Sequence, residues 1–404
     1  MKPLVFPLII AVFFFSSCHT DSQQKADETG DFIQIDSLPG QSPYLAKDNL
    51  GNVVMSWVRS TNDSSNIFCY AVSHDQGKSF GPAIEIPSSN NIEPHSENLP
   101  KIIYKPTGEI MALWGAANPN PKNKYSGLVY YSQSFDQGKT WTASSPLVKD
   151  TGSYDQRYYD VAMLNNGEIG IIWLDNRKTT HNQGSGLYFA STNGNAGFEE
   201  GRLISQPCCQ CCRTDLFVDT HGQVHVLYRG IIQDSIRDMV HIISTDGGKH
   251  FSLPQRISND NWVLNACPHT GPSMTENKEG IHFAWFTGGK NKGCFYNRST
   301  DNGLSFSAPE SISEMGSHPQ MASMTDGSVV ITWDETIKTD TSINKRIGIQ
   351  KRSQQGKEVL KKFITPGSGS SSFPVLTALN DNKCLVAYTM KRGKNTFVSY
   401  QVVN

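Results

Sequence analysis

The chain has 404 residues, of which 10% are aromatic, 34 are glycine and 20 are proline. This composition is typical of a soluble, turn-rich, all-β protein with a large core. Lys and Arg number 36 against 37 Asp and Glu, so the net charge is near zero. Because phosphate binding needs a basic face, and no run of Lys or Arg supplies one, the sequence argues against a nucleic-acid partner.

The first residues are predicted to be a lipoprotein signal peptide. A positive start at Lys2 is followed by an apolar run from Leu4 to Phe15, which is too short to cross a bilayer as a stable helix. The segment Phe15-Ser16-Ser17-Cys18 resembles the lipobox of bacterial lipoproteins, and the resemblance implies that Cys18 carries the lipid. A plain secretory signal is the alternative, and both signals send the mature protein outside the cytoplasm.

We therefore expect a signal peptide over residues 1–17 and a flexible tether over residues 18–30, which is almost free of apolar residues. The expected location is the cell envelope, at the outer membrane or cell surface of a Gram-negative bacterium. Membrane contact is expected through the lipid anchor only.

A repeated turn motif, Ser-x-Asp-x-Gly-x-x-aromatic, organises the rest of the chain. In a tight hairpin the Asp carboxylate accepts turn amides, Gly adopts a backbone angle that other residues avoid, and the aromatic ring packs beneath. The aspartates are therefore interpreted as structural. Four full copies begin at Ser73, Ser134, Ser244 and Ser299, and weaker copies begin at Ser191 and Ser353.

This motif resembles the Asp-box, or bacterial neuraminidase repeat, of the sialidase superfamily of β-propellers. The resemblance covers nearly the whole mature chain and implies a propeller fold, while it says much less about activity. A six-bladed ring is the number that the sialidase resemblance implies.

A second pattern lets the blades be counted. A turn Gly or Asn followed by an alternating strand that ends in an aromatic residue occurs seven times, from Gly51–Trp57 to Asn382–Tyr388. The seventh repeat lacks its last strand, and residues 31–36 form an unpaired strand at the start of the chain. We therefore predict a single domain over residues 31–404 with seven four-stranded blades, six being the alternative, and with the N-terminal strand closing the last blade. The seven aromatic residues are interpreted as core between blades.

The loops that lead into each first strand, and those between second and third strands, are expected to share one face around the central channel. Arginine offers a planar fork suited to a carboxylate or a sulfate, so an acidic sugar would fit this face. Each Arg could instead pair with a neighbouring carboxylate and hold loops together. The candidate catalytic residues in these loops are His95, Tyr158, Asp175, Arg177, Arg213, Arg229 and Arg237.

Four cysteines in five positions precede the fourth blade, and Cys267 and His269 stand at the corresponding place one repeat later. These residues could bind structural zinc or copper, which favour thiolate and imidazole ligands. Disulfides are the alternative outside the cytoplasm, and a redox thiol is the third. The candidate metal ligands are Cys208, Cys209, Cys211, Cys212, Cys267 and His269. Three further cysteines, at 69, 294 and 384, lie in predicted strands and are expected to be buried.

Four segments together resemble a group of exported bacterial proteins labelled sialidase-like. They are Trp-Leu-Asp-Asn-Arg at 173–177, Cys-Cys-x-Cys-Cys-Arg at 208–213, Arg237-Asp238 and Cys-Pro-x-x-Gly-Pro at 267–272. Sialidases use an arginine triad, a Tyr–Glu pair and an Asp acid/base; the first arginine of that triad has no match here, since Gln41-Ser42-Pro43-Tyr44 stands in its place. The first hypothesis is a lipid-anchored monomer that hydrolyses acidic oligo- or polysaccharides. A lyase acting on uronic-acid glycans and a non-catalytic glycan-binding or metal-binding surface protein are the alternatives.

Overall fold

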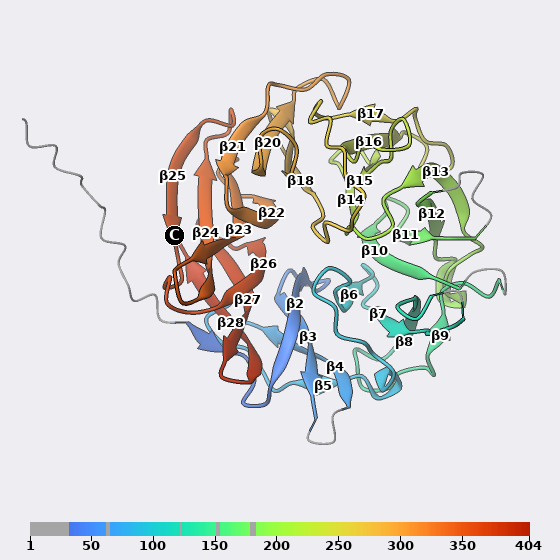
Figure 1. Ribbon diagram of the computed structural model, residues 1–404. Helices are drawn as coiled ribbons and strands as arrows, with labels where there is room; N and C mark the ends of the chain where they lie inside the picture. Colours follow the sequence, from blue (N-terminus) through green and yellow to red (C-terminus); the bar gives the residue numbers. More distant parts are fainter. Residues whose placement is uncertain (1–31, 62–64, 122, 151–153, 178–182) are drawn as a thin grey trace, which may run out of the picture.

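A computed structural model describes residues 32–61, 65–121, 123–150, 154–177 and 183–404. Seven four-stranded antiparallel sheets are arranged as the blades of a ring (Figure 1), so the predicted all-β, seven-bladed propeller is confirmed and six blades is wrong. The signal peptide, the tether and Cys18 lie outside the described residues. Among the residues that are described, no helix has the length and apolar character needed to span a membrane.

Blades one to six are meanders that run from the channel outward, and the seventh takes its outermost strand from the start of the chain. The strands are β1 (Ile33–Gln34), β2 (Gly40–Lys47), β3 (Val53–Ser60), β4 (Asn66–Ser73), β5 (Ile84–Glu85), β6 (Lys101–Tyr104), β7 (Ile110–Ala117), β8 (Gly127–Ser134), β9 (Ser145–Pro146), β10 (Gln156–Met163), β11 (Ile169–Asp175), β12 (Ser185–Ser191), β13 (Arg202–Cys208), β14 (Asp215–Val218), β15 (Val224–Arg229), β16 (Met239–Ser244), β17 (Gln255–Arg256), β18 (Ser273–Asn277), β19 (Gly280–Thr287), β20 (Gly293–Ser299), β21 (Glu310–Ser313), β22 (Gly316–Ser323), β23 (Val329–Lys338), β24 (Ile343–Arg352), β25 (Glu358–Phe363), β26 (Ser371–Ala378), β27 (Cys384–Arg392) and β28 (Asn395–Val403). Two short 3-10 helices, η1 (Pro87–Ser89) and η2 (Gly194–Ala196), lie in loops.

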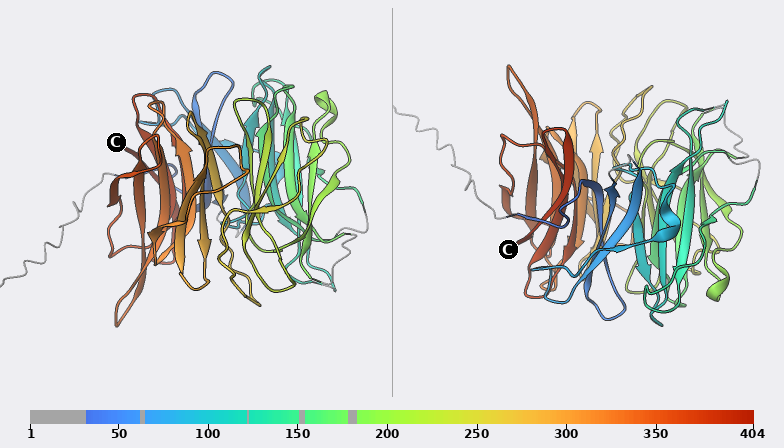
Figure 2. Two further views of the ribbon diagram at one scale, coloured as in Figure 1. Left: turned by 90° about the horizontal axis from the view of Figure 1, so that it is seen from above. Right: turned by 90° about the horizontal axis from the view of Figure 1, so that it is seen from below.

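The ring closes through the N-terminal strand, as predicted. The seventh sheet has the order β1-β28-β27-β26, with Ile33 opposite Tyr400 in an antiparallel pair. The first and last parts of the described chain therefore share one blade, and the outer edge of β28 is covered. Figure 2 shows from the side that the strands run between the two faces of the ring.

The predicted aromatic core is confirmed. At the same place in every second strand lies an aromatic ring with at most 2% of its surface exposed, and these seven rings fill the space around the blades. They are Trp57, Trp114, Trp173, Tyr228, Trp285, Trp333 and Tyr388. The three cysteines predicted to be core residues, Cys69, Cys294 and Cys384, are buried as well.

The Asp-box turns have the structural role expected of them. In the first copy, Ser73 Oγ donates a hydrogen bond to Asp75, and the same carboxylate accepts the backbone N–H of Ser79 at 2.9 Å. These hydrogen bonds, above all those from Ser79, lower the pKa of Asp75 to about 2. Gly77 has a φ of 77°, which explains why glycine occupies that position.

The innermost strands of four blades are irregular where they reach the channel mouth. Their pairing register shifts in β2, β10, β22 and β26, and each shift contains a non-glycine residue with a left-handed backbone. Such a conformation costs of order 1–3 kcal/mol and is concentrated at functional sites. The residues in question are Ser42, Tyr158, His318 and Phe373.

Charged side chains lie on the innermost strands β6, β10 and β14. Lys101 forms an ion pair with Asp160, whose other carboxylate oxygen accepts the backbone N–H of Leu216. Asp215, on β14, accepts the backbone N–H of Met274 at 2.6 Å. Burial and the nearby Asp160 charge raise the pKa of Asp215 from 3.8 to about 7, against the opposing effect of Arg213 and Lys101.

This shift predicts how stability depends on pH. Because the folded protein binds the Asp215 proton more tightly than the unfolded chain does, the stabilising contribution is complete below about pH 4 and is lost as the pH rises toward about 7. Asp215→Asn removes this titration, so the parent protein should lose stability relative to the variant as the pH rises. Urea unfolding of both proteins across this range measures the difference, and a constant difference would contradict the assignment.

Candidate active site

A cleft of about 510 Å³ opens on the face where first strands begin, between blades two and three and the loops that lead into blades four and five. Its walls carry two imidazoles, two phenols, two thiols, a guanidinium, an ammonium group and a carboxylate, which is an unusual concentration of titratable groups for a nearly neutral chain. The chemically active lining residues are Glu93, His95, Lys124, Tyr125, Arg157, Tyr158, Gln210, Cys211, Cys267 and His269.

Tyr158 is fixed at the floor of this cleft. Its φ is 57°, its backbone N–H donates to Asn98 Oδ1 at 2.9 Å, and its carbonyl accepts the Thr214 hydroxyl at 2.7 Å. The side chain has no exposed surface, and burial raises the pKa of Tyr158 well above its ordinary value. The phenol is therefore neutral at physiological pH, in a strained conformation held by two neighbouring loops.

Two histidines contact Tyr158. The Tyr158 hydroxyl lies 3.5 Å from Nδ1 of His269, an exposed residue, while the His95 ring packs edge-on against the phenol at 5.5 Å between centroids. Nδ1 of His95 accepts the backbone N–H of Glu97, so Nε2 carries the hydrogen of the neutral ring. Burial, with the neighbouring His269 and Arg157, lowers the pKa of His95 to about 4, which leaves it uncharged at neutral pH.

The cleft brings together His95 and Tyr158, as the sequence predicts, and adds two residues that the prediction leaves out. Arg157 lies 5.5 Å from the Tyr158 ring centroid and pairs with Asp155 at 2.8 Å. Glu93 lies exposed in the lining. Glu93 and Arg157 are close in sequence to the predicted His95 and Tyr158. Neighbouring side chains in a strand normally point to opposite faces, so the sequence does not show that Arg157 lines the same cleft as Tyr158.

Arg213 lies deeper, and its guanidinium binds backbone oxygens. Nη1 donates to the carbonyl of Pro272 at 2.7 Å, and Nη2 contacts the carbonyls of Gly271 and Pro319. Its Nε lies 3.6 Å from the Glu97 carboxylate, which also accepts the Gly271 N–H. These are the contacts of a residue that ties blades two, four, five and six together across the channel.

Arg177 and Asp175 lie away from the cleft, over the outer part of blade three. The Arg177 guanidinium stacks on Tyr188 at 4.3 Å from the ring centroid and lies 3.4 Å from Asp175. Asp175 has no exposed surface, and it also accepts the indole N–H of Trp173. The structure does not bring this pair together with His95 and Tyr158.

Arg229 and Arg237 lie between blades four and five. Arg229 is 1% exposed, and its donors reach Cys212 Sγ at 3.3 Å and the carbonyls of Arg237, Thr270 and Phe286. Arg237 donates to the Leu264 carbonyl and lines a second cavity of about 430 Å³, adjacent to the cleft. The four predicted arginines therefore occupy three separate places instead of one.

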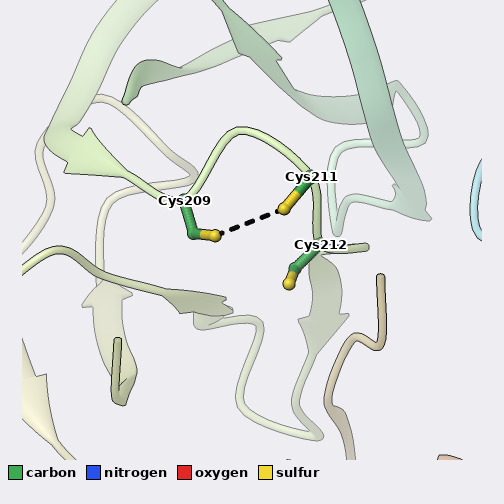
Figure 3. Close-up of side chains that lie close together, drawn as sticks. All are labelled: Cys209, Cys211 and Cys212. Carbon is green, nitrogen blue, oxygen red and sulfur yellow. Dashed lines mark hydrogen bonds between the residues drawn. The ribbon is translucent and has the colours of Figure 1, made fainter. Parts of the chain in front are cut away.

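Three of the six predicted metal ligands converge. The sulfur atoms of Cys209, Cys211 and Cys212 lie within 4.8 Å of one another on the loop between β13 and β14, and all three residues are buried (Figure 3). Cys209 Sγ and Cys211 Sγ are 3.5 Å apart, a thiol hydrogen bond rather than a disulfide. Burial alone would raise the pKa of Cys212, but hydrogen bonds from Cys209 and Cys211 and the charge of Arg229 lower it well below its ordinary value.

The other three predicted ligands lie outside this group in the described part of the chain. The Cys208 thiol is buried and points to the Ser205 carbonyl, Cys267 is exposed on the cleft wall, and His269 contacts Tyr158. The eight described cysteines are all free thiols.

A larger cavity of about 780 Å³ lies beside β17, outside the channel mouth. Its main charged groups are already paired, since Arg256 binds Asp238 and Asp260 binds Ser258 and the Trp285 indole. We therefore place the candidate site in the smaller cleft, where the titratable groups contact one another.

No family model and no curated protein matches this chain. Solved structures do match it. A protein of unknown function from Dyadobacter fermentans is similar with a TM-score of 0.52 and 13% identity, over 94% of this chain and 98% of that one.

Two glycan-processing enzymes are also similar. The intramolecular trans-sialidase of Ruminococcus gnavus, solved with oseltamivir carboxylate, gives a TM-score of 0.52 and 10% identity, over 90% of this chain and 94% of that one. NanB sialidase from Streptococcus pneumoniae gives 0.50 and 12%, over 90% and 68% of the respective chains. At these identities the likeness is one of fold, and the chain has the propeller fold that is found in bacterial sialidases.

Proposed function

We propose that this protein cleaves acidic glycans in the cleft of His95, Tyr158 and His269. The observation that carries the proposal is the contact of the Tyr158 hydroxyl with His269 Nδ1, beside a neutral His95 and a single arginine. An imidazole oriented by a second group is the usual arrangement for moving a proton in catalysis. The propeller neighbours that act on sialic acid support a saccharide substrate.

In the reaction that this geometry supports best, His269 acts as the base. When its Nδ1 hydrogen is donated to the Tyr158 oxygen, Nε2 is free to remove a proton next to the carboxylate of a uronic acid. Arg157 would bind that carboxylate and stabilise the charge that develops, while the neutral His95 Nε2–H would donate a hydrogen bond to the leaving oxygen. The proton that His269 Nε2 removes from the sugar would then be passed to the leaving oxygen, which restores the neutral His269 ring. Tyr158 is then a positioning residue, which agrees with its lack of exposed surface.

Sialidase-type hydrolysis is the second candidate, because the same contact can serve a tyrosine nucleophile. Tyr158 would give its proton to His269 and attack the anomeric carbon, and the exposed Glu93 would act as acid and base. For this reaction the His269 side chain must move aside, since Tyr158 is fully covered.

The test is to incubate the mature protein with sialylated, uronic and sulfated oligosaccharides and to weigh the products by mass spectrometry. Hydrolysis adds one water molecule to the products, whereas elimination adds none and leaves a double bond that absorbs ultraviolet light. Binding without product would support a glycan-binding module instead. If neither binding nor product is found with any acidic glycan, the proposal is wrong.

A charge-specific prediction concerns Arg157. Arg157→Gln should raise KM for a carboxylated substrate by about 10–100-fold, since a hydrogen bond to a charged group contributes about 1.5–3 kcal/mol. A carboxyl-reduced analogue cannot undergo the elimination, so its dissociation constant is measured instead, and this should show little change. Arg346→Gln is the matched control, because Arg346 pairs with Glu335 on blade six, away from the cleft. Equal losses on the charged and reduced substrates would contradict the assignment.

Export and a lipid anchor at Cys18 are part of the proposal and rest on the sequence of residues 1–18. An outer envelope location would give the site access to extracellular acidic polysaccharides. Globomycin-sensitive processing and incorporation of labelled palmitate, both lost in Cys18→Ala, are the expected results.

A further inference from the structure

A buried arginine that has no carboxylate partner lies beside the three converging cysteines. Arg229 is 1% exposed, and within the described part of the chain its guanidinium takes part in no ion pair with Asp or Glu. Isolated buried charges are strongly unfavourable, so buried cations are normally paired. Among the groups that accept a hydrogen bond from Arg229 in the described part of the chain, the Cys212 sulfur, at 3.3 Å, is the one that can carry negative charge.

The three sulfur atoms are placed to bind a metal ion as well as to balance the charge of Arg229. Cys209, Cys211 and Cys212 lie within 4.8 Å of one another, and all are at most 4% exposed. The short loop fixes them: the Cys209 N–H donates to the Arg229 carbonyl at 2.8 Å, and Arg229 in turn holds the loop before β18 through the Thr270 carbonyl. Three thiols placed this closely without a disulfide are a typical pre-formed site for a soft metal ion.

From this arrangement we propose that Cys209, Cys211 and Cys212 bind one thiophilic d10 ion, Cu(I) or Zn(II), with Arg229 balancing the charge of the metal–thiolate group. Three thiolates and a monovalent or divalent ion carry a net negative charge, which the buried guanidinium offsets. Arg229 would not bind the ion itself but donates a hydrogen bond to the ligand Cys212, and residues that hydrogen-bond to a ligand adjust the properties of the metal.

The coordination number separates the two ions. Cu(I) is satisfied by three sulfur ligands, whereas Zn(II) takes four ligands in a tetrahedron. Cys209 and Cys211 both line the cavity of about 430 Å³, so a water molecule or the exposed Cys267 on the same wall can supply the fourth position. The ion would then lie next to the glycan cleft, which Cys211 also lines, without depending on the activity proposed there.

The experiment uses the full mature chain, purified under reducing, oxygen-free conditions and loaded separately with Cu(I) and Zn(II). After desalting, we expect one ion per chain for at least one metal. X-ray absorption should count three sulfur neighbours for copper, or three sulfurs and one lighter atom or fourth sulfur for zinc. No retained ion, or an ion surrounded only by nitrogen and oxygen, would overturn the proposal.

Variants keep the test informative if one of them folds poorly. Cys211→Ser and Cys209→Ser should each lose the bound ion and the rise in melting temperature that the metal gives the parent protein. Cys294→Ser, at a buried cysteine in blade five, should keep both. A disulfide between two of the three cysteines in protein taken anaerobically from the cell envelope would also overturn the proposal, because the cluster would then be a covalent crosslink.

Discussion

Replacing His269 with Asn should lower kcat by about 10²–10⁴-fold, the usual contribution of a general acid or base. The side chain is exposed and its contact with the Tyr158 hydroxyl is long, at 3.5 Å, so the substitution should leave the melting temperature nearly unchanged. Steady-state kinetics with the glycan found in the substrate panel, together with thermal unfolding, measure both effects. His250→Asn is the control, because His250 is an exposed histidine in an Asp-box turn on the opposite face.

Tyr158→Phe then separates the two reactions. If Tyr158 only positions His269, the variant should keep measurable turnover with a shifted pH profile, whereas loss of all turnover and of any covalent intermediate would identify a nucleophile. Tyr159→Phe is the matched control: its hydroxyl donates to the carbonyls of Leu99 and Leu113, so this change should lower stability by about 1–3 kcal/mol and spare turnover. Normal kinetics in His269→Asn would remove the cleft as the active site.

The fold was predictable from sequence because its determinants are local and repeated. The Asp-box turn is specified within eight residues, as the hydrogen bonds of Ser73, Asp75 and Ser79 show, and each copy marks one blade. The last repeat lacks its outer strand, and the N-terminal strand belongs to no other repeat. Pairing the two completes seven four-stranded blades, which is how the ring closes.

The site was less predictable, because loops of similar composition reach different depths. Arg157 is the second residue of β10 and Arg213 lies just before β14, yet Arg157 lines the cleft while Arg213 is buried among carbonyls. This difference in depth arises from the register shift around Tyr158, a backbone feature that no residue pattern in the sequence predicts. Likewise, Cys208 differs from Cys209 only by ending a strand, and its thiol points away from the other three.

Arg229→Met should destabilise the fold by about 3–5 kcal/mol, the effect expected when one member of a buried charged network is removed. The guanidinium donates to three carbonyls and to Cys212, and it stacks on Trp262 at 4.9 Å. Methionine can keep the contact with the ring, but it leaves the carbonyls of Arg237, Thr270 and Phe286 without their donor. Each such loss costs about 1–3 kcal/mol.

Chemical unfolding measures this effect, and Arg237→Met is the control. Arg237 belongs to the same loop region but donates to one carbonyl, that of Leu264, so its replacement should cost less than about 1.5 kcal/mol. Stability equal to that of the parent in Arg229→Met would show that the carbonyls find other donors and that the buried charge is dispensable. Because Arg229 contacts both the cysteine loop and the loop that carries His269, its loss should also loosen the cleft, and His269-dependent turnover should fall even where the variant remains folded.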